Sequence, residues 1–259
     1  MRRRFFVEGF EEATAALHGE AAEHLGRVLR AEPGQLYELS DGRSIWLSRV
    51  ERVALAKRGA SRIDFALVEP IPVRERKLRI EILISLVKFD RFEWCLEKAT
   101  ELGVAEIIPL AAARSDKPLL AAAVKRRARW EKLIFESAQQ ARRLGPPAIS
   151  RASLPAEAFA RSRAGCKILL SEGREAPSLR EALSNGGGAD TVSLAIGPEG
   201  GWTDKEIAAA RASGFAEASL GENILRTETA VIAALAIVSF VLGGRLIAVK
   251  DGGTRARNL

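Results

Sequence analysis

The chain has 259 residues, a length that suits one large domain or two ordinary ones. Hydrophobic residues make up 47% and charged residues 28%, the profile of a globular protein in water, and the formal net charge is +7. Only two cysteines occur, Cys95 and Cys166, without CxxC spacing, which argues against a disulfide framework or a cysteine-based metal site and for a cytoplasmic location. The longest apolar stretch, 230–242, is too short for a bilayer span.

The positive charge is concentrated in the middle third of the chain. Over residues 73–150, Lys and Arg number 16 against 10 Asp and Glu, chiefly in the segments 74–79 and 125–129. Such a patch suits a polyanion, most often nucleic acid. A solvated helix face explains the same residues, and composition leaves both interpretations open.

Residues 1–72 are predicted to form a small β-barrel or β-sandwich. Alternating hydrophobic patterns flank the Asp41–Gly42 turn, and Asp-Gly between extended runs is a strong hairpin signal. Helical spacing over 21–30 predicts one helix inside this unit. Pro70 and Pro72 mark a linker to the next domain.

From Leu78 onward, strands alternate with helices, which predicts a mostly parallel α/β sheet in a second domain over 73–250, followed by a tail over 251–259. The expected strands are 78–87, 104–112, 167–172, 191–196 and 216–220. The expected helices are 89–103, about 118–143, one from about 178, one from Thr203 and a last apolar helix.

The sequence IGPEGG, residues 196–201, directly follows the apolar strand TVSLAI. In open α/β sheets, ligands bind at the carboxyl ends of the strands, and glycines let a ligand lie against bare backbone groups. Thr203 with Glu206 predicts a capping box at the start of the next helix. A tight turn without a ligand is the alternative. The loop matches neither a P-loop nor a GxGxxG fingerprint.

A second informative stretch, LGENILRTETA, follows a short strand and is expected to reach the same edge of the sheet. Thr227 or Thr229 is expected to cap the helix that follows. Arg226 lies between a glycine turn and an all-apolar helix, where an arginine without a role is uncommon. The alternative for Arg226 is a surface ion pair with Glu222 or Glu228, which contributes little.

GPEGG after an apolar strand, followed by LGENILRTETA, resembles the RsmE family of the SPOUT methyltransferases. The resemblance extends along the chain through RRFF, HLGRVLR, the PGQ and DG turns and KATELGVAEIIPL. Members of that family use S-adenosylmethionine to methylate N3 of a uridine, uridine 1498, in small-subunit 16S ribosomal RNA. The resemblance therefore implies an enzyme of ribosome biogenesis that acts on the assembled 30S subunit.

The resemblance also implies an architecture. A PUA-like RNA-binding β-barrel is expected over 1–72 and a SPOUT methyltransferase domain over 73–250, with a deep trefoil knot and the cofactor site at about 168–245. A cytoplasmic homodimer is expected, with no membrane and no metal. Two alternatives stay open: a non-catalytic RNA-binding or ribosome-assembly factor, and a SPOUT methyltransferase that acts on tRNA.

The cofactor site implied by the resemblance is built from three loops. Its residues are Ser171, Glu172, Ile196, Gly197, Pro198, Glu199, Gly200, Gly201, Leu220, Gly221, Asn223, Ile224, Leu225 and Arg226. Removing the N3 proton places negative charge on uracil O2 and O4, so Arg226 is the expected catalytic cation and Glu228 the orienter or base. Glu199 is expected either to meet the ribose or the sulfonium, or to cap the next helix.

RNA contacts are expected from both domains, through cations beside aromatic side chains. The expected residues are Arg2, Arg3, Arg4, Phe5, His24, Arg27, Arg30, Lys88, Gln140 and Arg143. Arg27 and Arg30 are placed on one helix face with His24. Phe5 and Phe6 begin the first strand in the alternative interpretation, with at least one of them buried. Lys98 and Glu101 are assigned to ordinary pairing on a helix surface.

Overall fold

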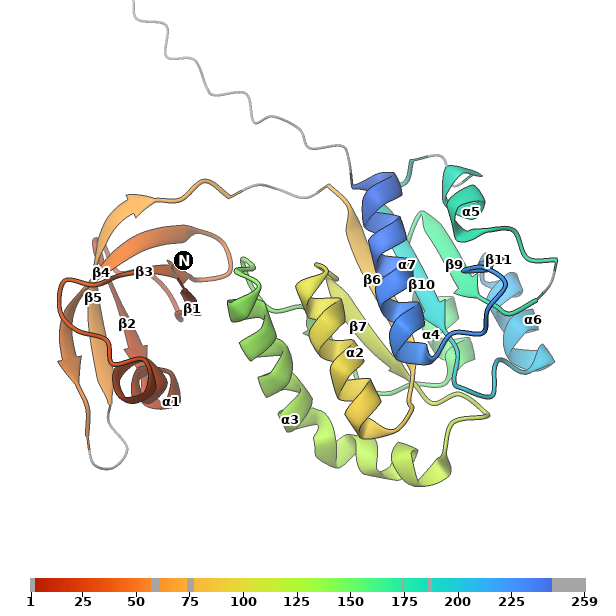
Figure 1. Cartoon of the computed structure of the whole chain (residues 1–259), viewed down its shortest axis with the longest axis horizontal. Coiled ribbons are helices and arrows are strands. Elements are labelled where there is room, and N and C mark those ends of the chain that lie inside the picture. The colour runs from red at the N-terminus through yellow and green to blue at the C-terminus, as the bar shows by residue number, and fades with distance from the viewer. Residues whose placement is uncertain (1–2, 57–60, 74–76, 174, 186–187, 244–259) are drawn as a thin grey trace, which may run out of the picture.

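The computed structural model describes residues 3–56, 61–73, 77–173, 175–185 and 188–243, which form two separate sheets (Figure 1). The predicted RNA contact Arg2, the tail over 251–259 and the end of the second predicted domain lie outside the described residues. Within those ranges, no helix is long and apolar enough to cross a membrane.

The N-terminal sheet has five strands in the order β1-β3-β4-β5-β2. They are β1 (Arg4–Phe6), β2 (Thr14–His18), β3 (Leu36–Ser40), β4 (Ile45–Ala54) and β5 (Arg62–Pro70). β1 runs parallel to β3, and the other neighbours are antiparallel. The carboxylate of Asp41 accepts hydrogen bonds from the amides of Arg43 and Ser44 at 2.9 and 2.7 Å, which closes the β3–β4 hairpin. The predicted Asp-Gly hairpin is therefore confirmed.

The helical segment inside this unit lies two residues earlier in the chain than its sequence pattern predicts. It consists of α1 (Gly19–Glu23), continued by one π-helical segment, η1 (His24–Val28). Arg30 lies beyond it with a φ of 53°, a left-handed conformation that ends the helix. The placement of Arg30 on one helix face with His24 and Arg27 was therefore wrong.

The second sheet has six strands in the order β11-β9-β10-β6-β7-β8. The strands are β6 (Arg79–Ser85), β7 (Glu106–Leu110), β8 (Ala148–Ile149), β9 (Cys166–Leu170), β10 (Thr191–Ile196) and β11 (Ala216–Ala218). All neighbouring pairs are parallel, which confirms the predicted α/β architecture. The helices are α2 (Phe89–Glu101), α3 (Lys117–Gln140), α4 (Pro155–Arg161), α5 (Leu179–Asn185), α6 (Asp204–Ala212) and α7 (Thr227–Leu242).

Helices cover both faces of this sheet, because successive strand residues point to opposite sides. Ile82 of β6 is buried in the larger core with residues of α2, α3, α5 and α7, whereas Leu83 next to it joins the smaller core. That second core contains Phe159 of α4 and Ala210 of α6. Figure 1 shows α2, α3 and α7 on the near face. The short elements β8 and α4 were not predicted, since two and seven residues carry too little periodicity.

A buried ion cluster joins the N-terminal sheet to the segment after α3. The side chains of Arg4 and Glu38 are 8% and 5% exposed, and Arg4 Nη2 lies 2.8 Å from Glu38 Oε2. The guanidinium of Arg142 pairs with the other oxygen, Glu38 Oε1. Close by, the hydroxyl of Ser40 donates to the carbonyl of Leu144 at 2.6 Å. One carboxylate thus pairs with two arginines at the junction of the two sheets.

We expect Glu38→Ala to lower the free energy of unfolding by about 3–5 kcal/mol, because it leaves the buried guanidinium of Arg4 without its counter-ion. Urea denaturation followed by circular dichroism measures the change. Glu51→Ala is the matched control, since the Arg49–Glu51 pair is about half exposed and contributes about 0–1 kcal/mol. Equal unfolding midpoints for both variants would contradict the expectation.

Candidate functional site

Three loops meet at one edge of the parallel sheet, because β11, β9 and β10 are neighbours and run in the same direction. The loops begin at Ser171, Gly197 and Ser219. The amide of Ser171 donates to the carbonyl of Ala218 at 2.9 Å, and the amide of Ser219 donates to that of Pro177 at 2.8 Å. The expectation that the stretch after the short strand reaches the edge of the glycine loop is confirmed.

The glycine loop is a tight turn packed against Trp202. The amide of Gly201 donates to the carbonyl of Pro198 at 2.8 Å, and Gly201 has a φ of 69°. A Cβ at Gly197 would lie 3.1 Å from the indole ring of Trp202, closer than side chains normally pack. The indole Nε1 donates to the carbonyl of Leu170 at 2.9 Å, which fixes the ring beneath the loop.

Arg114 holds the far side of the same loop. Its Nη1 donates to the carbonyl of Gly200 at 2.7 Å and to that of Trp202 at 3.2 Å. A Cβ at Gly200 would lie 3.3 Å from the Cβ and the Cδ of Arg114. Sequence reasoning missed this residue, because a single arginine after β7 carries no local signal of a contact with a loop far along the chain.

The predicted capping box at the start of α6 is confirmed. The hydroxyl of Thr203 accepts from the amide of Glu206, and the Glu206 carboxylate accepts from the amide of Thr203. Glu206 also accepts from the amide of Ala113 at 2.8 Å, which ties α6 to the segment after β7. The carboxylate of this capping box is that of Glu206. Glu199 of the glycine loop forms an ion pair with Arg91 instead.

The start of α7 differs from its prediction. Arg226 is the N-cap residue and makes no side-chain capping bond. Thr227 lies inside the helix, and its hydroxyl donates to the carbonyl of Gly197 at 3.4 Å. The prediction that Thr227 or Thr229 caps α7 was therefore wrong, since the chain enters the helix one residue earlier. The hydroxyl of Thr227 instead joins α7 to the glycine loop.

Two carboxylates and one guanidinium meet beside this helix start. Arg91 of α2 pairs through Nη1 with Glu199 of the glycine loop, and its Nε lies 3.9 Å from Glu228 Oε1. The other oxygen, Glu228 Oε2, is buried and has no hydrogen-bond partner among the described residues. Burial raises the pKa of the nearby Cys95 thiol to about 12, and the charge of Glu228 adds to the effect, so this thiol stays neutral.

Arg226 remains exposed beside this cluster. Its guanidinium forms no ion pair with any residue that the structure describes, so the alternative of a surface pair receives no support. Arg226 and Glu228 both lie at the start of α7, Arg226 as its N-cap and Glu228 in its first turn. A ligand with an N–H donor and a developing negative charge matches both groups.

Apolar side chains from the same loops form the other part of the candidate site. Ile196 is buried at the end of β10, whereas Leu220 and Leu225 are half-buried. Ile224 is 77% exposed, an unusual state for a large apolar side chain. The polar and glycine residues of the predicted cofactor set are half-buried or exposed along the loops, namely Ser171, Glu172, Gly221 and Asn223.

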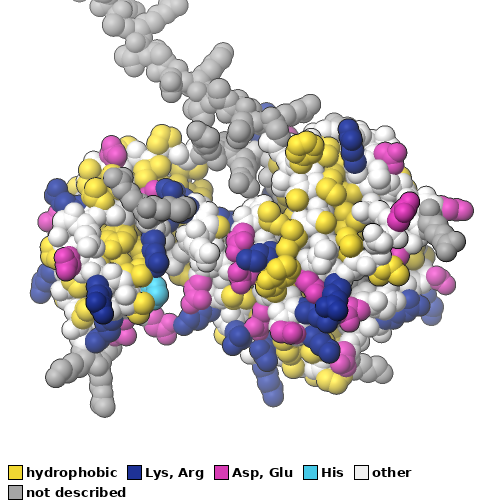
Figure 2. All heavy atoms as spheres, viewed as in Figure 1, with side chains coloured by type: hydrophobic (Ala, Val, Ile, Leu, Met, Phe, Trp, Pro, Cys, Tyr) yellow, Lys and Arg dark blue, Asp and Glu magenta, His cyan; other side chains and the backbone are white. Residues whose placement is uncertain are grey.

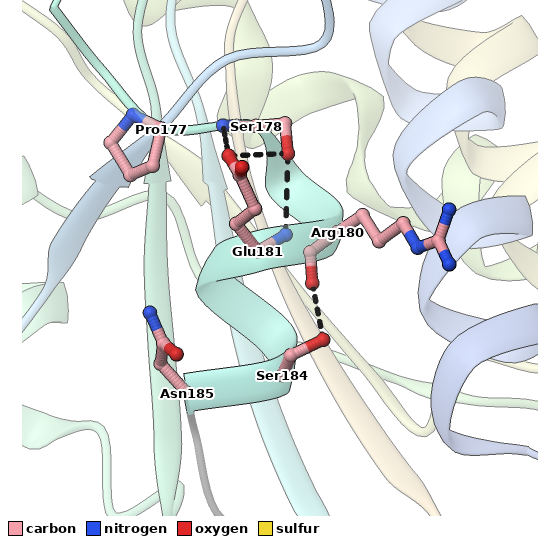
Figure 3. Close-up of a pocket in the computed structure, with 6 residues that line it drawn as sticks. All are labelled: Pro177, Ser178, Arg180, Glu181, Ser184 and Asn185. Atoms are coloured by element: carbon pink, nitrogen blue, oxygen red, sulfur yellow. Dashed lines mark hydrogen bonds between the residues drawn. The ribbon is translucent and has the colours of Figure 1, made fainter.

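A hollow of about 660 Å³ lies at the start of α5, away from the glycine loop (Figure 3). Its lining residues are Pro177, Ser178, Arg180, Glu181, Ser184 and Asn185. Ser178 and Glu181 bond to each other, and the hydroxyl of Ser184 donates to the carbonyl of Arg180. We therefore place the candidate site at the three loops, where polar groups stay unpartnered, and not in this hollow.

The residues predicted to contact RNA fall into two groups. Arg4 and Phe5 are buried, with Arg4 paired to Glu38 and Phe5 packed edge-on against Tyr37 at 5.8 Å between ring centroids. They are not accessible for RNA in this structure. The exposed members are Arg3, His24, Arg27, Arg30, Lys88 and Gln140.

Arg143 and the basic segment 125–129 already bond within the protein. Arg143 donates to the carbonyls of Thr100 and Val104 at 2.8 and 2.6 Å, at the end of α2. In α3, both Arg126 and Arg129 pair with Glu93, and Arg127 pairs with Glu131. Basic and acidic side chains are interspersed over this face (Figure 2). The predicted helix-surface pairing of Lys98 with Glu101 is confirmed, at 2.9 Å.

No group of three His, Cys, Asp or Glu residues is placed to hold a metal ion in the described part of the chain.

Comparison with known proteins gives the family context of this site. The RNA methyltransferase domain family matches residues 74–239. The ribosomal RNA small subunit methyltransferase E of Synechocystis sp. is 32% identical over 235 residues, which cover 89% of this chain and 74% of the relative. The crystal structure of the enzyme of the same name from Neisseria gonorrhoeae, bound to S-adenosyl methionine, is similar with a TM-score of 0.82 and 28% identity, over 95% of this chain and 100% of that one. A putative methyltransferase from Legionella pneumophila in complex with the same cofactor has a TM-score of 0.78 and 28% identity, over 93% and 98% of the two chains.

Proposed function

The chain belongs to the ribosomal RNA small subunit methyltransferase E family, and from this premise we propose that it methylates N3 of uridine 1498 in 16S ribosomal RNA. It is an S-adenosylmethionine-dependent ribosomal RNA methyltransferase. The observation that carries this function is the convergence of three loops at the carboxyl ends of β9, β10 and β11. The assembled 30S subunit in the cytoplasm is the proposed substrate.

The loop residues fit the cofactor. Adenine needs a flat apolar slot with backbone donors and acceptors, and the exposed Ile224 with Leu220, Leu225 and the glycine backbone can supply both. A side chain at Gly197 would press on the ring of Trp202, because its Cβ would lie 3.1 Å from the indole. Glycine at this position therefore lets the loop lie directly against the ring. When bound, S-adenosylmethionine supplies an electrophilic methyl group and leaves as a neutral thioether.

Glu228 and Arg226 are the proposed catalytic residues. The carboxylate of Glu228 accepts the N3 proton of uracil, and the N3 lone pair forms the bond to the methyl carbon as the carbon–sulfur bond breaks. The exposed guanidinium of Arg226 stabilises the negative charge that develops on O2 or O4.

The finer architecture is part of the proposal. We infer that residues 1–72 are a PUA-like RNA-binding barrel, that 73–250 form the SPOUT domain, and that about 168–245 thread a deep trefoil knot around the cofactor site. We also infer a homodimer. Phe240 of α7 is 88% exposed, and hydrophobic side chains run along α7 on the face seen in Figure 2, which supports a partner subunit there.

The RNA is proposed to contact the exposed members of the predicted set, and Arg4 and Phe5 are left out of it because they are buried. Arg27 and His24 in the N-terminal sheet unit and Lys88 before α2 are the strongest candidates, since their side chains face solvent. Gln140 lies at the end of α3, between the two units.

Small ribosomal subunits that lack the methyl group, incubated with the purified protein and methyl-labelled S-adenosylmethionine, test the function. Mass spectrometry of nuclease fragments is expected to place one methyl group on N3 of uridine 1498. Label in tRNA, or at another nucleotide of 16S RNA, would contradict the proposed substrate. Binding to the subunit without any transfer would favour a non-catalytic assembly factor.

We expect Gly200→Val to abolish cofactor binding. The Cβ of a valine there would lie 3.3 Å from the Cβ and the Cδ of Arg114, so the loop or Arg114 has to move and the bond from Arg114 to the carbonyl of Gly200 is disturbed. Calorimetric titration with S-adenosylmethionine measures the loss. Gly9→Val is the matched control, because nothing lies within 4 Å of the added Cβ there. Equal affinity of both variants for S-adenosylmethionine would show that the glycine loop does not bind the cofactor.

A further inference from the structure

We propose that Arg91 is a positioning residue that holds the cofactor loop and the proton acceptor in one arrangement. This inference rests on the proposed function, because it assigns roles to the two carboxylates that Arg91 contacts. Nothing in the motifs of the glycine loop or of α7 points to Arg91, which lies more than 100 residues earlier, in the first turns of α2.

The geometry of Arg91 is that of a bridge between two elements. Its Nη1 hydrogen-bonds to Glu199 Oε1 in the glycine loop, and its Nε lies 3.9 Å from Glu228 Oε1 in the first turn of α7. The side chain is 26% exposed, that of Glu228 only 16%. A guanidinium has five N–H donors on a rigid plane, so it can serve carboxylates on two of its edges at once.

Among the described residues, Arg91 is the cation that pairs with the Glu228 carboxylate. The neighbouring Cys95 thiol is neutral, and Arg226 forms no ion pair in the part of the chain that the structure describes. Glu228 Oε1 therefore faces Arg91, while Oε2 stays without a partner. Arg91 is therefore placed to orient the Glu228 carboxylate through Oε1.

The same side chain also limits where the glycine loop can lie. Arg114 holds the loop through the carbonyl of Gly200, and Arg91 holds it through the side chain of Glu199. A change in the position of Glu199 is thereby transmitted to Glu228 through one guanidinium. Arg91 thus couples the cofactor loop to the residue that accepts the proton, without itself touching either reacting atom.

A double-mutant cycle tests this role, using the full-length protein, S-adenosylmethionine and unmethylated small ribosomal subunits. The variants are Arg91→Gln, Arg91→Lys, Glu199→Gln and the double variant R91Q/E199Q. Arg91→Gln is expected to slow single-turnover methyl transfer and to weaken cofactor binding, each by roughly 2- to 150-fold, the range for residues in one network. The double variant is expected to bind the cofactor no more weakly than Arg91→Gln alone. Arg91→Lys, which keeps the charge but lacks the planar fork, is expected to fall between wild type and Arg91→Gln in transfer rate.

Arg211→Ala is the matched control, since it removes an arginine–glutamate pair between α6 and β11, where Arg211 Nε lies 2.9 Å from Glu217 Oε1. Additive effects of Arg91→Gln and Glu199→Gln would overturn the proposal, as would an Arg91→Gln variant that matches Arg211→Ala in transfer rate and cofactor affinity. A lower melting temperature with normal transfer would also overturn it, because that result means a structural role only. If wild type binds the cofactor but transfers no methyl group, the proposed function fails. The double-mutant cycle in cofactor affinity still shows in that case whether Arg91 and Glu199 are coupled.

Discussion

Replacing Arg226 by alanine is expected to lower the rate of methyl transfer by about 10²–10³-fold, with little effect on stability. Loss of a donor aimed at a developing oxyanion has this cost in other acyl- and group-transfer sites. Arg226 is exposed and makes no capping bond, so its removal breaks no contact that holds α7 in place. Single-turnover transfer to small ribosomal subunits and thermal unfolding measure the two quantities.

Arg161→Ala provides the comparison for this variant, because Arg161 is an exposed arginine of α4, on the opposite face of the sheet. Its transfer rate is expected to equal that of wild type. Normal transfer by Arg226→Ala, with normal stability, would remove Arg226 from the mechanism. If Arg226→Ala failed to fold, the expectation that Arg226 has little effect on stability would be wrong.

Replacing Glu228 by glutamine is expected to reduce methyl transfer by about 10²–10⁴-fold, the usual contribution of a positioned base. The amide keeps the size of the side chain but cannot take up the N3 proton. Its neutral head group also loses the attraction to Arg91, whose Nε lies 3.9 Å from the carboxylate. Cofactor affinity is expected to change far less than the rate, because Glu228 is assigned to the proton and not to the adenosine.

The measurement is the single-turnover rate together with calorimetric titration of the cofactor. Glu157→Gln, an exposed carboxylate of α4, is the matched control. A Glu228→Gln variant with an unchanged rate would show that another group or solvent takes the proton. Equal losses in cofactor affinity and in rate would instead assign Glu228 to binding.

Periodicity predicted the parallel sheet well, because its strands are bounded by turns and α2 is strongly amphipathic. β10 matches the predicted 191–196, and α2 ends within two residues of its prediction at Gly103. The pattern failed where short-range geometry decided the outcome. Arg30 ends its helix in a left-handed conformation, and Arg226 takes the cap position that the threonines after it were expected to fill.

The loops of the site could be located from sequence, because glycine-rich turns after apolar strands mark the ligand edge of such sheets. The partners of those loops could not. Arg91 and Arg114 reach the glycine loop from α2 and from the segment after β7, and their contacts depend on how distant segments pack. Likewise, the buried state of Arg4 follows from Glu38 and Arg142, which no local pattern around Arg4 reveals.

Arg142 and Arg143 are adjacent in the chain, yet they bond in opposite directions. Arg142 pairs with Glu38 in the N-terminal sheet, whereas Arg143 donates to the carbonyls of Thr100 and Val104 at the end of α2. Two adjacent arginines after α3 thus contact both the N-terminal sheet and the end of the helix that carries Arg91, beside the bond from Ser40 to Leu144. A substrate that contacts both parts therefore meets two surfaces that the protein's own side chains tie together.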